Sequence, residues 1–289
     1  YSTGDTGIDE RGYNDIQFLP HTGIESWNFG GMHRDIWLES TEEVTISKVL
    51  LNAHDNVLET YTVLYNAGSE DRTIDIDLFA HADRVNPTDS HANVVVPANS
   101  VKVYYEVLQI PDVEEWSYVT PNMYEMKVEI YENGNILDSL HSTYGMRTVE
   151  TFSNEPGVAD GAGILLNSHE IKLKGFGWSD DFYSESLQSS GTNISREMYE
   201  FQFDTIRNQM DANFVRNLQN DRHPRAYDVM DEYGLMNMQE TPFHWLNPDV
   251  VSYQLNTYGA MEMMLGVSVW NNMNHPSIIK FRLRAIKNY

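Results

Sequence analysis

The 289-residue sequence contains no cysteine, which excludes disulfide bonds and thiolate metal sites. Basic residues are also scarce: 19 Lys and Arg stand against 43 Asp and Glu, a formal net charge of −24. Nucleic acid is therefore an unfavourable partner, because phosphate binding requires clustered Lys and Arg. No apolar run approaches the roughly 18 residues of a membrane-spanning helix, so no membrane partner is predicted. The start at Tyr1 suggests that a preceding segment was removed, and secreted, periplasmic and cytoplasmic locations all stay open.

Short β-strands are predicted from Val44 to about Glu150. Residues 73–78 alternate with period two, which places Ile74, Ile76 and Leu78 on one face of a strand. Asn133-Gly134 predicts a tight hairpin turn. Strands that follow one another every ten residues or so, without helices, describe a β-sandwich. Residues 32–38 also alternate and are predicted to form a strand before this domain.

The pattern changes after a polar, Gly-bearing segment, Thr151–Gly163, which is interpreted as a linker. Hairpin and strand patterns then alternate with helical ones, an order typical of half an eight-fold α/β barrel. The expected elements are a hairpin and strand over 164–177, helices at about 197–210, 223–233 and 252–273, and strands near 213–216, 235–238 and 277–279. Ser195 is the expected N-cap of the first helix, and Gly234 is expected to stop the second.

Polar groups end two neighbouring strands of this α/β segment. Arg216 ends one strand, and Gln239 and Glu240 end the next. Ligands of parallel α/β folds bind at the carboxyl ends of strands, so chemistry is expected there. The ten histidines show no metal-type spacing, and neither a metal nor a cofactor is predicted. His275, which precedes Pro276, is predicted to be a buried structural histidine.

Several motifs together resemble glycoside hydrolase family 2, the β-galactosidase and β-glucuronidase group. They follow one another in the family's order over about 260 residues. The motifs are Phe29–Leu38, Glu115–Ser117 with Pro121–Tyr124, Tyr144–Val149, Leu166-Asn167 with Leu173–Gly177, Asn213–Arg216, Asp231–Leu235, Gln239–Pro242 and Asn274–Ile279.

The resemblance implies a multidomain β plus α/β architecture. Residues 1–42 would be the C-terminal remnant of a jelly-roll sugar-binding domain. Residues 43–150 would form an immunoglobulin-like β-sandwich, and residues 151–289 the first half of a (β/α)8 TIM barrel. On this interpretation the chain is a fragment, truncated at both ends. Half a barrel leaves unpaired strand edges, so self-association through those edges is expected.

The resemblance also implies retaining hydrolysis of terminal β-glycosidic bonds by two glutamates about 5–5.5 Å apart. In the family these glutamates follow barrel strands four and seven. This sequence instead ends, after Ile279, in the basic segment Lys280–Tyr289, which contains no Glu. Both catalytic glutamates are therefore expected to be absent, and activity would belong to the complete parent enzyme. A native tail, a reading-frame change after Ile279 and a cloning artefact are alternative origins of that segment.

Site roles follow from the same resemblance, each beside a structural alternative. Arg216 would orient the nucleophilic carboxylate, or it would form an interior ion pair with Glu240. Glu240 and its neighbour Gln239 would support the site. Carbohydrate would be the partner: Asp180 and Asp181 would accept hydrogen bonds from sugar hydroxyls, or would merely be solvated. The aromatic groups would line the sugar or pack in the core; these are Trp178, Phe243, His244 and Trp245.

A second function class stays open beside the enzyme. The chain could be a non-catalytic carbohydrate-binding or scaffold protein that kept the fold and lost the chemistry. The sugar, the linkage and the oligomeric state are not determined by the sequence.

Overall fold

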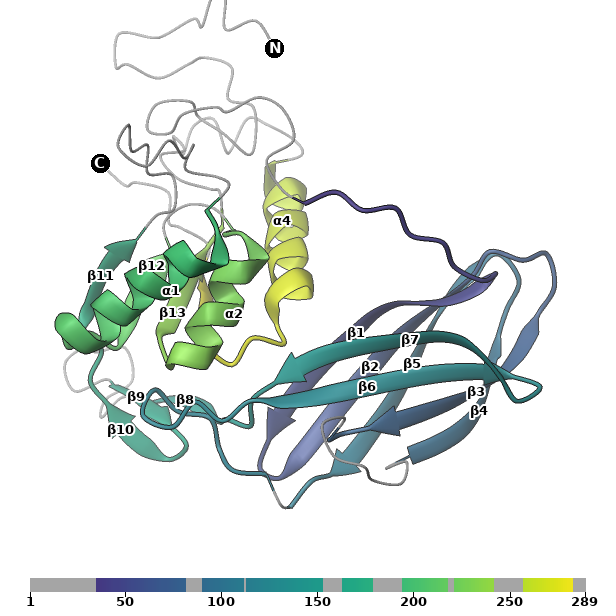
Figure 1. Cartoon of the computed structure of the whole chain (residues 1–289), viewed down its shortest axis with the longest axis horizontal. Coiled ribbons are helices and arrows are strands. Elements are labelled where there is room, and N and C mark those ends of the chain that lie inside the picture. Colours follow the sequence, from purple (N-terminus) through teal and green to yellow (C-terminus); the bar gives the residue numbers. More distant parts are fainter. Residues whose placement is uncertain are drawn as a thin grey trace, which may run out of the picture.

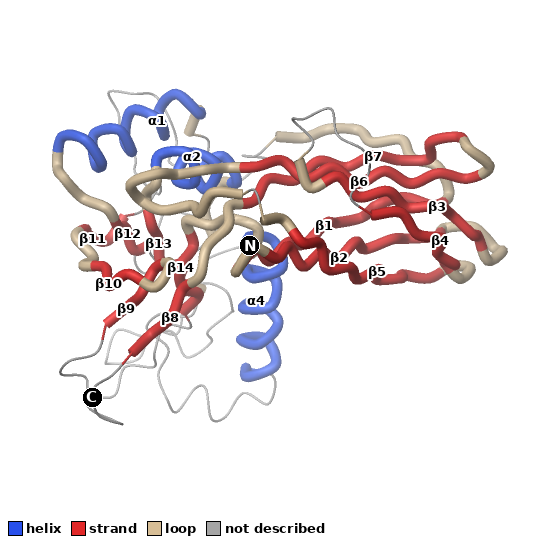
Figure 2. Tube along the Cα trace, turned by 90° about the horizontal axis from the view of Figure 1, so that it is seen from below, coloured by secondary structure: helices blue, strands red, loops and turns tan. Residues whose placement is uncertain are grey.

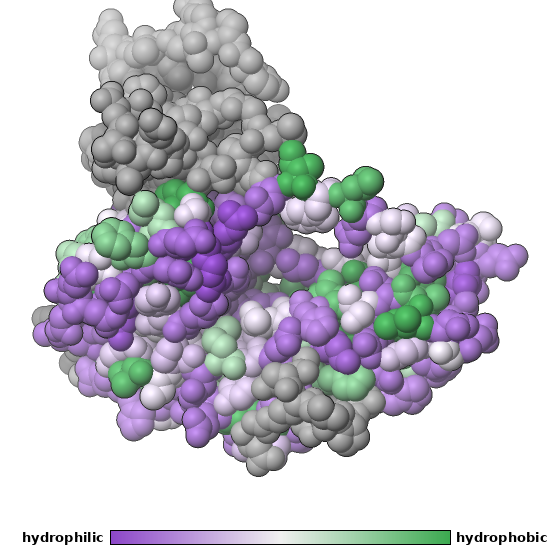
Figure 3. Space-filling model, viewed as in Figure 1, coloured by the Kyte–Doolittle hydropathy of each residue, from purple (hydrophilic) through white to green (hydrophobic). Residues whose placement is uncertain are grey.

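The computed structural model describes residues 35–81, 90–111, 113–152, 163–178, 194–217, 221–241 and 257–282. These residues form an elongated β-sandwich with a smaller α/β unit beside it, joined by a short three-stranded sheet (Figure 1). On the face shown in Figure 3, the coloured surface is mainly hydrophilic and hydrophobic side chains form small separate groups. No helix among the described residues is long and apolar enough to cross a membrane.

The sandwich consists of two antiparallel sheets, seen in Figure 2. One has the order β1-β2-β5, with β1 at Val44–His54, β2 at Val57–Asn66 and β5 at Ser100–Gln109. The other has the order β4-β3-β6-β7, with β4 at Ser90–Val96, β3 at Arg72–Phe79, β6 at Tyr124–Glu132 and β7 at Asn135–Tyr144.

The predicted period-two pattern of β3 is confirmed. Ile74, Ile76 and Leu78 are buried in the core between the sheets, where they pack with the inward residues of β1, β2 and β6. The predicted hairpin is confirmed as well. Asn133 and Gly134 both have positive φ, 50° and 77°, which a two-residue turn between β6 and β7 requires.

The strand predicted before the sandwich was wrong in its described part, and the predicted linker Thr151–Gly163 is described only at its ends. Residues 35–38, predicted to be strand, form none, and Ile36, Trp37 and Leu38 are exposed. A strand requires a paired neighbour, and no described strand pairs with this segment. The predicted linker begins and ends in strands: Thr151 pairs with Ile164, between β8 (Val149–Phe152) and β9 (Gly163–Leu166). Strand β10 (His169–Ile171) completes this small sheet, and residues 153–162 lie outside the described part.

The α/β unit is a four-stranded parallel sheet with the order β11-β12-β13-β14. The strands are β11 at Gly175–Trp178, β12 at Phe214–Asn217, β13 at Met236–Glu240 and β14 at Ile278–Arg282. Helix α1 (Arg196–Asp204) continues into a π-helical turn, η1 (Thr205–Gln209), and packs with α2 (Pro224–Tyr233). Helix α4 (Thr257–Asn272) precedes β14. Lys280, Phe281 and Arg282, the first residues of the basic tail, therefore belong to a paired strand.

Local signals explain where two of these helices begin and end. The Ser195 hydroxyl accepts a hydrogen bond from the Met198 amide, so the predicted N-cap of α1 is confirmed. Helix α2 has Pro224 at its first position and ends at Gly234, whose left-handed φ of 63° confirms the predicted stop. A side chain at Gly234 would also collide with the Tyr118 carbonyl group, so the same glycine brings α2 close to the sandwich.

Candidate functional site

The carboxyl ends of the parallel strands lie side by side in register. Trp178, Asn217, Gln239 and Phe281 occupy one row across the sheet. Because side chains alternate along a strand, this row and the preceding one, which contains Arg216, point to opposite faces. The predicted site residues of β12 and β13 are thus divided between two faces of the sheet.

Arg216 and Glu240 form an ion pair, with 3.3 Å between Nε of Arg216 and Oε1 of Glu240. The Glu240 side chain is fully buried, whereas the Arg216 side chain is 35% exposed. Such a pair places an accessible cation at the end of a strand and holds it against a carboxylate that solvent does not reach. This geometry agrees with the ion-pair interpretation of Arg216 and with a supporting role of Glu240.

Gln239 lies on the helix side and is held by neighbouring side chains. Its Oε1 accepts hydrogen bonds from the Tyr227 hydroxyl group at 2.6 Å and from Nδ2 of Asn217 at 3.1 Å. Asn237 extends this buried polar layer between β13 and α2 by donating to Oγ of Ser277. These bonds hold the Gln239 side chain on the helix side of the sheet, so Gln239 positions the end of β13 rather than facing an open cleft.

Trp178 packs inside the α/β unit. Its ring contacts those of Tyr199 and Phe203 of α1, with centroids 6.2 and 5.1 Å away, and its indole N–H donates to Gln202 at 3.3 Å. The Arg222 guanidinium lies 5.8 Å from the Trp178 ring centroid. These contacts favour the core alternative for this tryptophan over a wall facing a sugar. Asp180, Asp181, Phe243, His244 and Trp245 lie outside the described residues.

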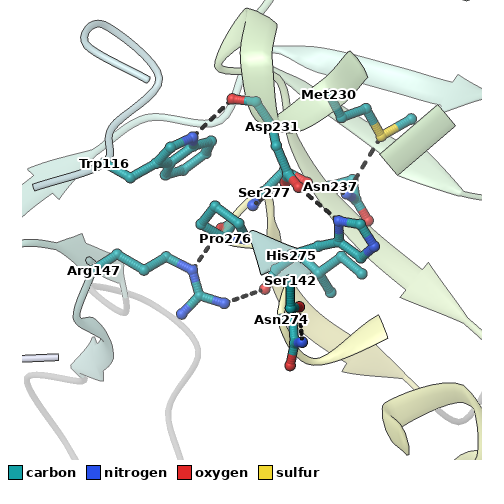
Figure 4. A network of polar contacts seen from close by, with 11 residues as sticks. Trp116, Ser142, Arg147, Met230, Asp231, Asn237, Asn274, His275, Pro276 and Ser277 are labelled. Atoms are coloured by element: carbon teal, nitrogen blue, oxygen red, sulfur yellow. Dashed lines mark hydrogen bonds and ion pairs between the residues drawn. The ribbon is translucent and has the colours of Figure 1, made fainter. Parts of the chain in front are cut away.

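A second polar cluster joins the α/β unit to the sandwich, and its members are drawn in Figure 4. The Asp231 carboxylate, at the end of α2, accepts from the Ser277 amide at 3.0 Å and interacts with Nδ1 of His275 at 2.6 Å. The Asp231 carbonyl oxygen accepts from the indole of Trp116 at 2.8 Å. The His275 side chain is 14% exposed and pairs with Asp231, so it is largely but not fully buried, and its contact agrees with the predicted structural role.

Two further side chains of this junction reach across it. Arg147 donates from Nε and Nη2 to the carbonyl oxygens of Pro276 and Ile278, immediately before and within β14 (Figure 4). The side-chain amide of Asn274 forms two hydrogen bonds with the backbone of β1: it accepts from the Leu51 N–H and donates to the Val49 carbonyl oxygen. Strand β14, the last strand of the described parallel sheet, is therefore anchored directly on the sandwich.

Sequence reasoning did not find this junction as a unit. Asp231 and His275 are 44 positions apart, and Trp116 is 115 positions from Asp231. Each residue lies in a motif that the family resemblance singles out, but a motif does not reveal its contact partner. Only the packing of α2 and β14 against the sandwich brings them together.

Burial and the Asp231 carboxylate act in opposite directions on His275. Burial lowers the pKa of His275, but the Asp231 carboxylate and, to a smaller extent, Asp228 raise it, and the net pKa lies above its ordinary value. Burial likewise lowers the pKa of Arg147, to about 10, against the opposing effect of Asp231. The folded chain thus favours the protonated form of His275 more than the unfolded chain does.

This shift predicts a pH-dependent contribution to stability. A raised folded-state pKa gives stability that is fully present below the unfolded pKa of about 6.5 and is lost as pH rises through the folded value. We expect His275→Gln to reduce the free energy of unfolding more at pH 6 than at pH 8, measured by denaturant unfolding. His91→Gln is the comparison for burial: Asp77 raises the pKa of that histidine too, but the pair is exposed and screened by solvent, so its pH dependence should be smaller. A loss for His275→Gln that is the same at both pH values would contradict the prediction.

Comparison with known proteins bears on both units. The model of the glycosyl hydrolases of family 2 matches residues 39–147, which cover the sandwich and the start of the junction. The resemblance to glycoside hydrolase family 2 is confirmed.

Among the described residues, no group of three or more His, Asp or Glu side chains is arranged to hold a metal ion.

Similar proteins extend the family 2 resemblance along most of the chain. A putative beta-glucuronidase of Formosa agariphila is 25% identical over 274 residues, covering 93% of this chain and 31% of the relative. A beta-galactosidase of Thermoanaerobacterium thermosulfurigenes is 22% identical over 280 residues, covering 90% of this chain and 35% of the relative. The chain thus spans about a third of the length of these curated relatives.

Solved structures share the fold. A family 2 beta-galacturonidase of Eisenbergiella tayi, bound to galacturonate, superposes with a TM-score of 0.77 at 18% identity. That match covers 92% of this chain and 45% of the other. A beta-glucuronidase of Bacteroides uniformis gives a TM-score of 0.74 at 18% identity, covering 93% of this chain and 32% of the other. The β-rich fold is therefore that of family 2 domains.

Proposed function

We propose that this chain is the central part of a family 2 glycoside hydrolase that cleaves terminal β-glycosidic bonds with retention, of the β-galactoside or β-glucuronide class. Carbohydrate is the partner that this proposal implies. The observation that carries it is the parallel sheet β11-β12-β13-β14, which presents the Arg216–Glu240 pair at its carboxyl edge and is fixed to a sandwich that matches the family. In parallel α/β folds that edge is where substrates bind.

The domain assignment is part of the proposal. Residues 43–150 would be the immunoglobulin-like support, residues 151–289 the first half of a TIM barrel, and residues 1–42 the end of a jelly roll. Two antiparallel sheets, whose strands are each seven residues or longer, pack face to face and support the first assignment. Four parallel strands with intervening helices support the second. Strand β8 crosses the proposed boundary at 150/151, so the small sheet β10-β9-β8 belongs to the junction.

Within this proposal the described site residues differ in role. Arg216 is the group that faces the ligand side, because its side chain keeps an exposed surface. Glu240 holds Arg216 in place, and Gln239 and Trp178 fix the ends of β13 and β11 from the helix side. Asp180 and Asp181 would accept sugar hydroxyls, and His244 and Trp245 would line the ring.

The proposal predicts that the 289-residue chain hydrolyses aryl β-galactosides and β-glucuronides no faster than buffer. Retaining hydrolysis requires two accessible carboxylates about 5–5.5 Å apart, and Glu240 is buried against Arg216. Turnover is measured by release of the aryl group. Turnover that Glu240→Gln abolishes would contradict this prediction.

The positive test uses a longer protein, in which this chain is expressed together with the further segments that the proposal implies. It should hydrolyse one of the two substrate classes, and Arg216→Ala should lower its kcat/KM by about 10²-fold or more. The control Arg196→Ala removes an arginine whose partners are Glu200 and Glu232 on the helix surface, and should leave kcat/KM unchanged. An extended product that binds sugars without hydrolysing them would favour the alternative, a non-catalytic carbohydrate-binding protein.

A further inference from the structure

The outer edge of β5 is long, regular and unprotected. The strand pairs with β2 from Ser100 to Gln109 without a register shift, and no described strand pairs with its other edge. Strand β1, at the opposite edge of the same sheet, is interrupted by a bulge between Ile46 and Lys48. An edge without a bulge or proline presents unpaired N–H and C=O groups that another strand can use.

The outward face of this strand is apolar along its length. Val101, Val103, Tyr105 and Val107 are 62%, 49%, 48% and 39% exposed, one on every second position. Tyr61 of β2, which lies in register with Tyr105, extends the face with its ring centroid 4.8 Å from that of Tyr105. Four successive outward positions without a charge are unusual for an exposed strand and are typical of an interface.

The other face of β5 carries Lys102 and Glu106, which can pair with each other only between two copies related by a two-fold axis. Lys102 is exposed and forms no ion pair in the described part of the chain. Glu106 is half-buried and accepts a hydrogen bond from the Tyr104 hydroxyl group at 2.6 Å. It lies four positions from Lys102, about 13 Å along an extended strand, so the two charges cannot meet within one chain. Antiparallel pairing of two copies centred on Tyr104 places Lys102 of each opposite Glu106 of the other. The same register sets Val101 opposite Val107 and Val103 opposite Tyr105.

We propose that two copies of this chain associate through β5, antiparallel and centred on Tyr104, to form a continuous six-stranded sheet. The contact is isologous, because each copy contributes the same strand. It forms two Lys102–Glu106 pairs, and its apolar stripe continues from one copy to the next. A shift of one residue loses both charge pairs, so the charges select this register.

Charge reversal tests the proposal by light scattering and sedimentation of the whole chain. Lys102→Glu and Glu106→Lys should each raise the dimer Kd at least about tenfold, because each places like charges opposite one another twice. The double variant K102E/E106K should restore the wild-type Kd. Lys174→Glu is the control: it changes the net charge as Lys102→Glu does, but at an exposed pair with Asp211 on the α/β unit.

The absence of cysteine makes cross-linking a second test that does not depend on affinity. A cysteine at position 104 lies on the proposed axis, so Tyr104→Cys should form a disulfide-linked dimer under mild oxidation. Val101→Cys should not, because two copies of position 101 are about 20 Å apart in this register.

Three outcomes would overturn the proposal. The first is a chain that stays monomeric at high micromolar concentration. The second is a dimer whose Kd is unaffected by Lys102→Glu, which would assign association to the edges of β11 or β14 or to another surface. The third is equal cross-linking through positions 104 and 101. Circular dichroism identifies variants that fold poorly. The double variant K102E/E106K and the two single-cysteine variants then test the proposal.

Discussion

Asp231→Ala is expected to lower the free energy of unfolding by about 3–5 kcal/mol, the loss typical of breaking a buried charge pair. Asp231 is 1% exposed. Its carboxylate interacts with Nδ1 of His275 and accepts a hydrogen bond from the Ser277 amide. Its removal leaves the largely buried imidazole of His275 and the buried N–H group of Ser277 without their partner, at the point where α2 and β14 meet the sandwich. Equilibrium denaturation followed by circular dichroism measures the loss.

The neighbouring Glu232 provides the control. Its side chain is 46% exposed and pairs with Arg196, so Glu232→Ala should lower the free energy of unfolding by no more than about 1 kcal/mol. Asp231→Asn keeps the shape and one acceptor and should fall between the two. Similar small losses for Asp231→Ala and Glu232→Ala would show that the junction contributes little to stability.

The expected loss has a consequence for the candidate site. Arg147 and Asn274 anchor both sides of the turn before β14 on the sandwich, and β14 in turn pairs with β13, whose end carries Glu240. The rigid sandwich thus supports the sheet edge that holds Arg216. Loosening the junction in the extended enzyme should disturb activity without touching a residue that contacts substrate.

The elements of the fold were largely predictable because their signals are local. Alternation predicted Ile74, Ile76 and Leu78 as core residues of β3, and Asn133-Gly134 predicted the β6–β7 turn. Gly234 and Ser195 marked helix ends through backbone conformation and capping. Residues 35–38 show the limit of this reasoning. Their alternating pattern fits a strand, but strand formation depends on a partner that local sequence does not specify.

The candidate site was predicted in part, for a similar reason. The strand ends at Arg216 and Glu240 followed from the α/β pattern, and the structure pairs them. The direction of each side chain did not follow, because a one-residue difference in position selects the opposite face of the sheet. Trp178 was therefore left between a sugar-facing wall and core packing, and Gln239 was given a supporting role without a direction. In the structure their side chains contact α1 and α2. The Asp231 cluster depends on contacts between distant segments, which no local pattern encodes.

Gly175→Ala is expected to destabilise the α/β unit by about 3 kcal/mol or more, at the upper end for overpacked sites. A Cβ atom at position 175 would lie 1.7 Å from the carbonyl oxygen of Phe214, the residue with which Gly175 pairs. That neighbour is backbone, so relief requires β11 to move away from β12. Such a movement would also break the bonds from Asn213 and Phe214 to the Lys174 carbonyl.

Hydrogen exchange localises this effect, because separation of β11 from β12 should speed exchange at the amides of residues 214–217 while those of the sandwich stay protected. Gly266→Ala in α4 is the matched control. A Cβ atom there meets no atom of the described residues within 4 Å, and alanine is the better helix former, so the free energy of unfolding should rise by about 0.5–1 kcal/mol. A neutral Gly175→Ala would mean that β11 can separate from β12 without loss. The position of Arg216 at the carboxyl edge of the sheet would then not depend on β11.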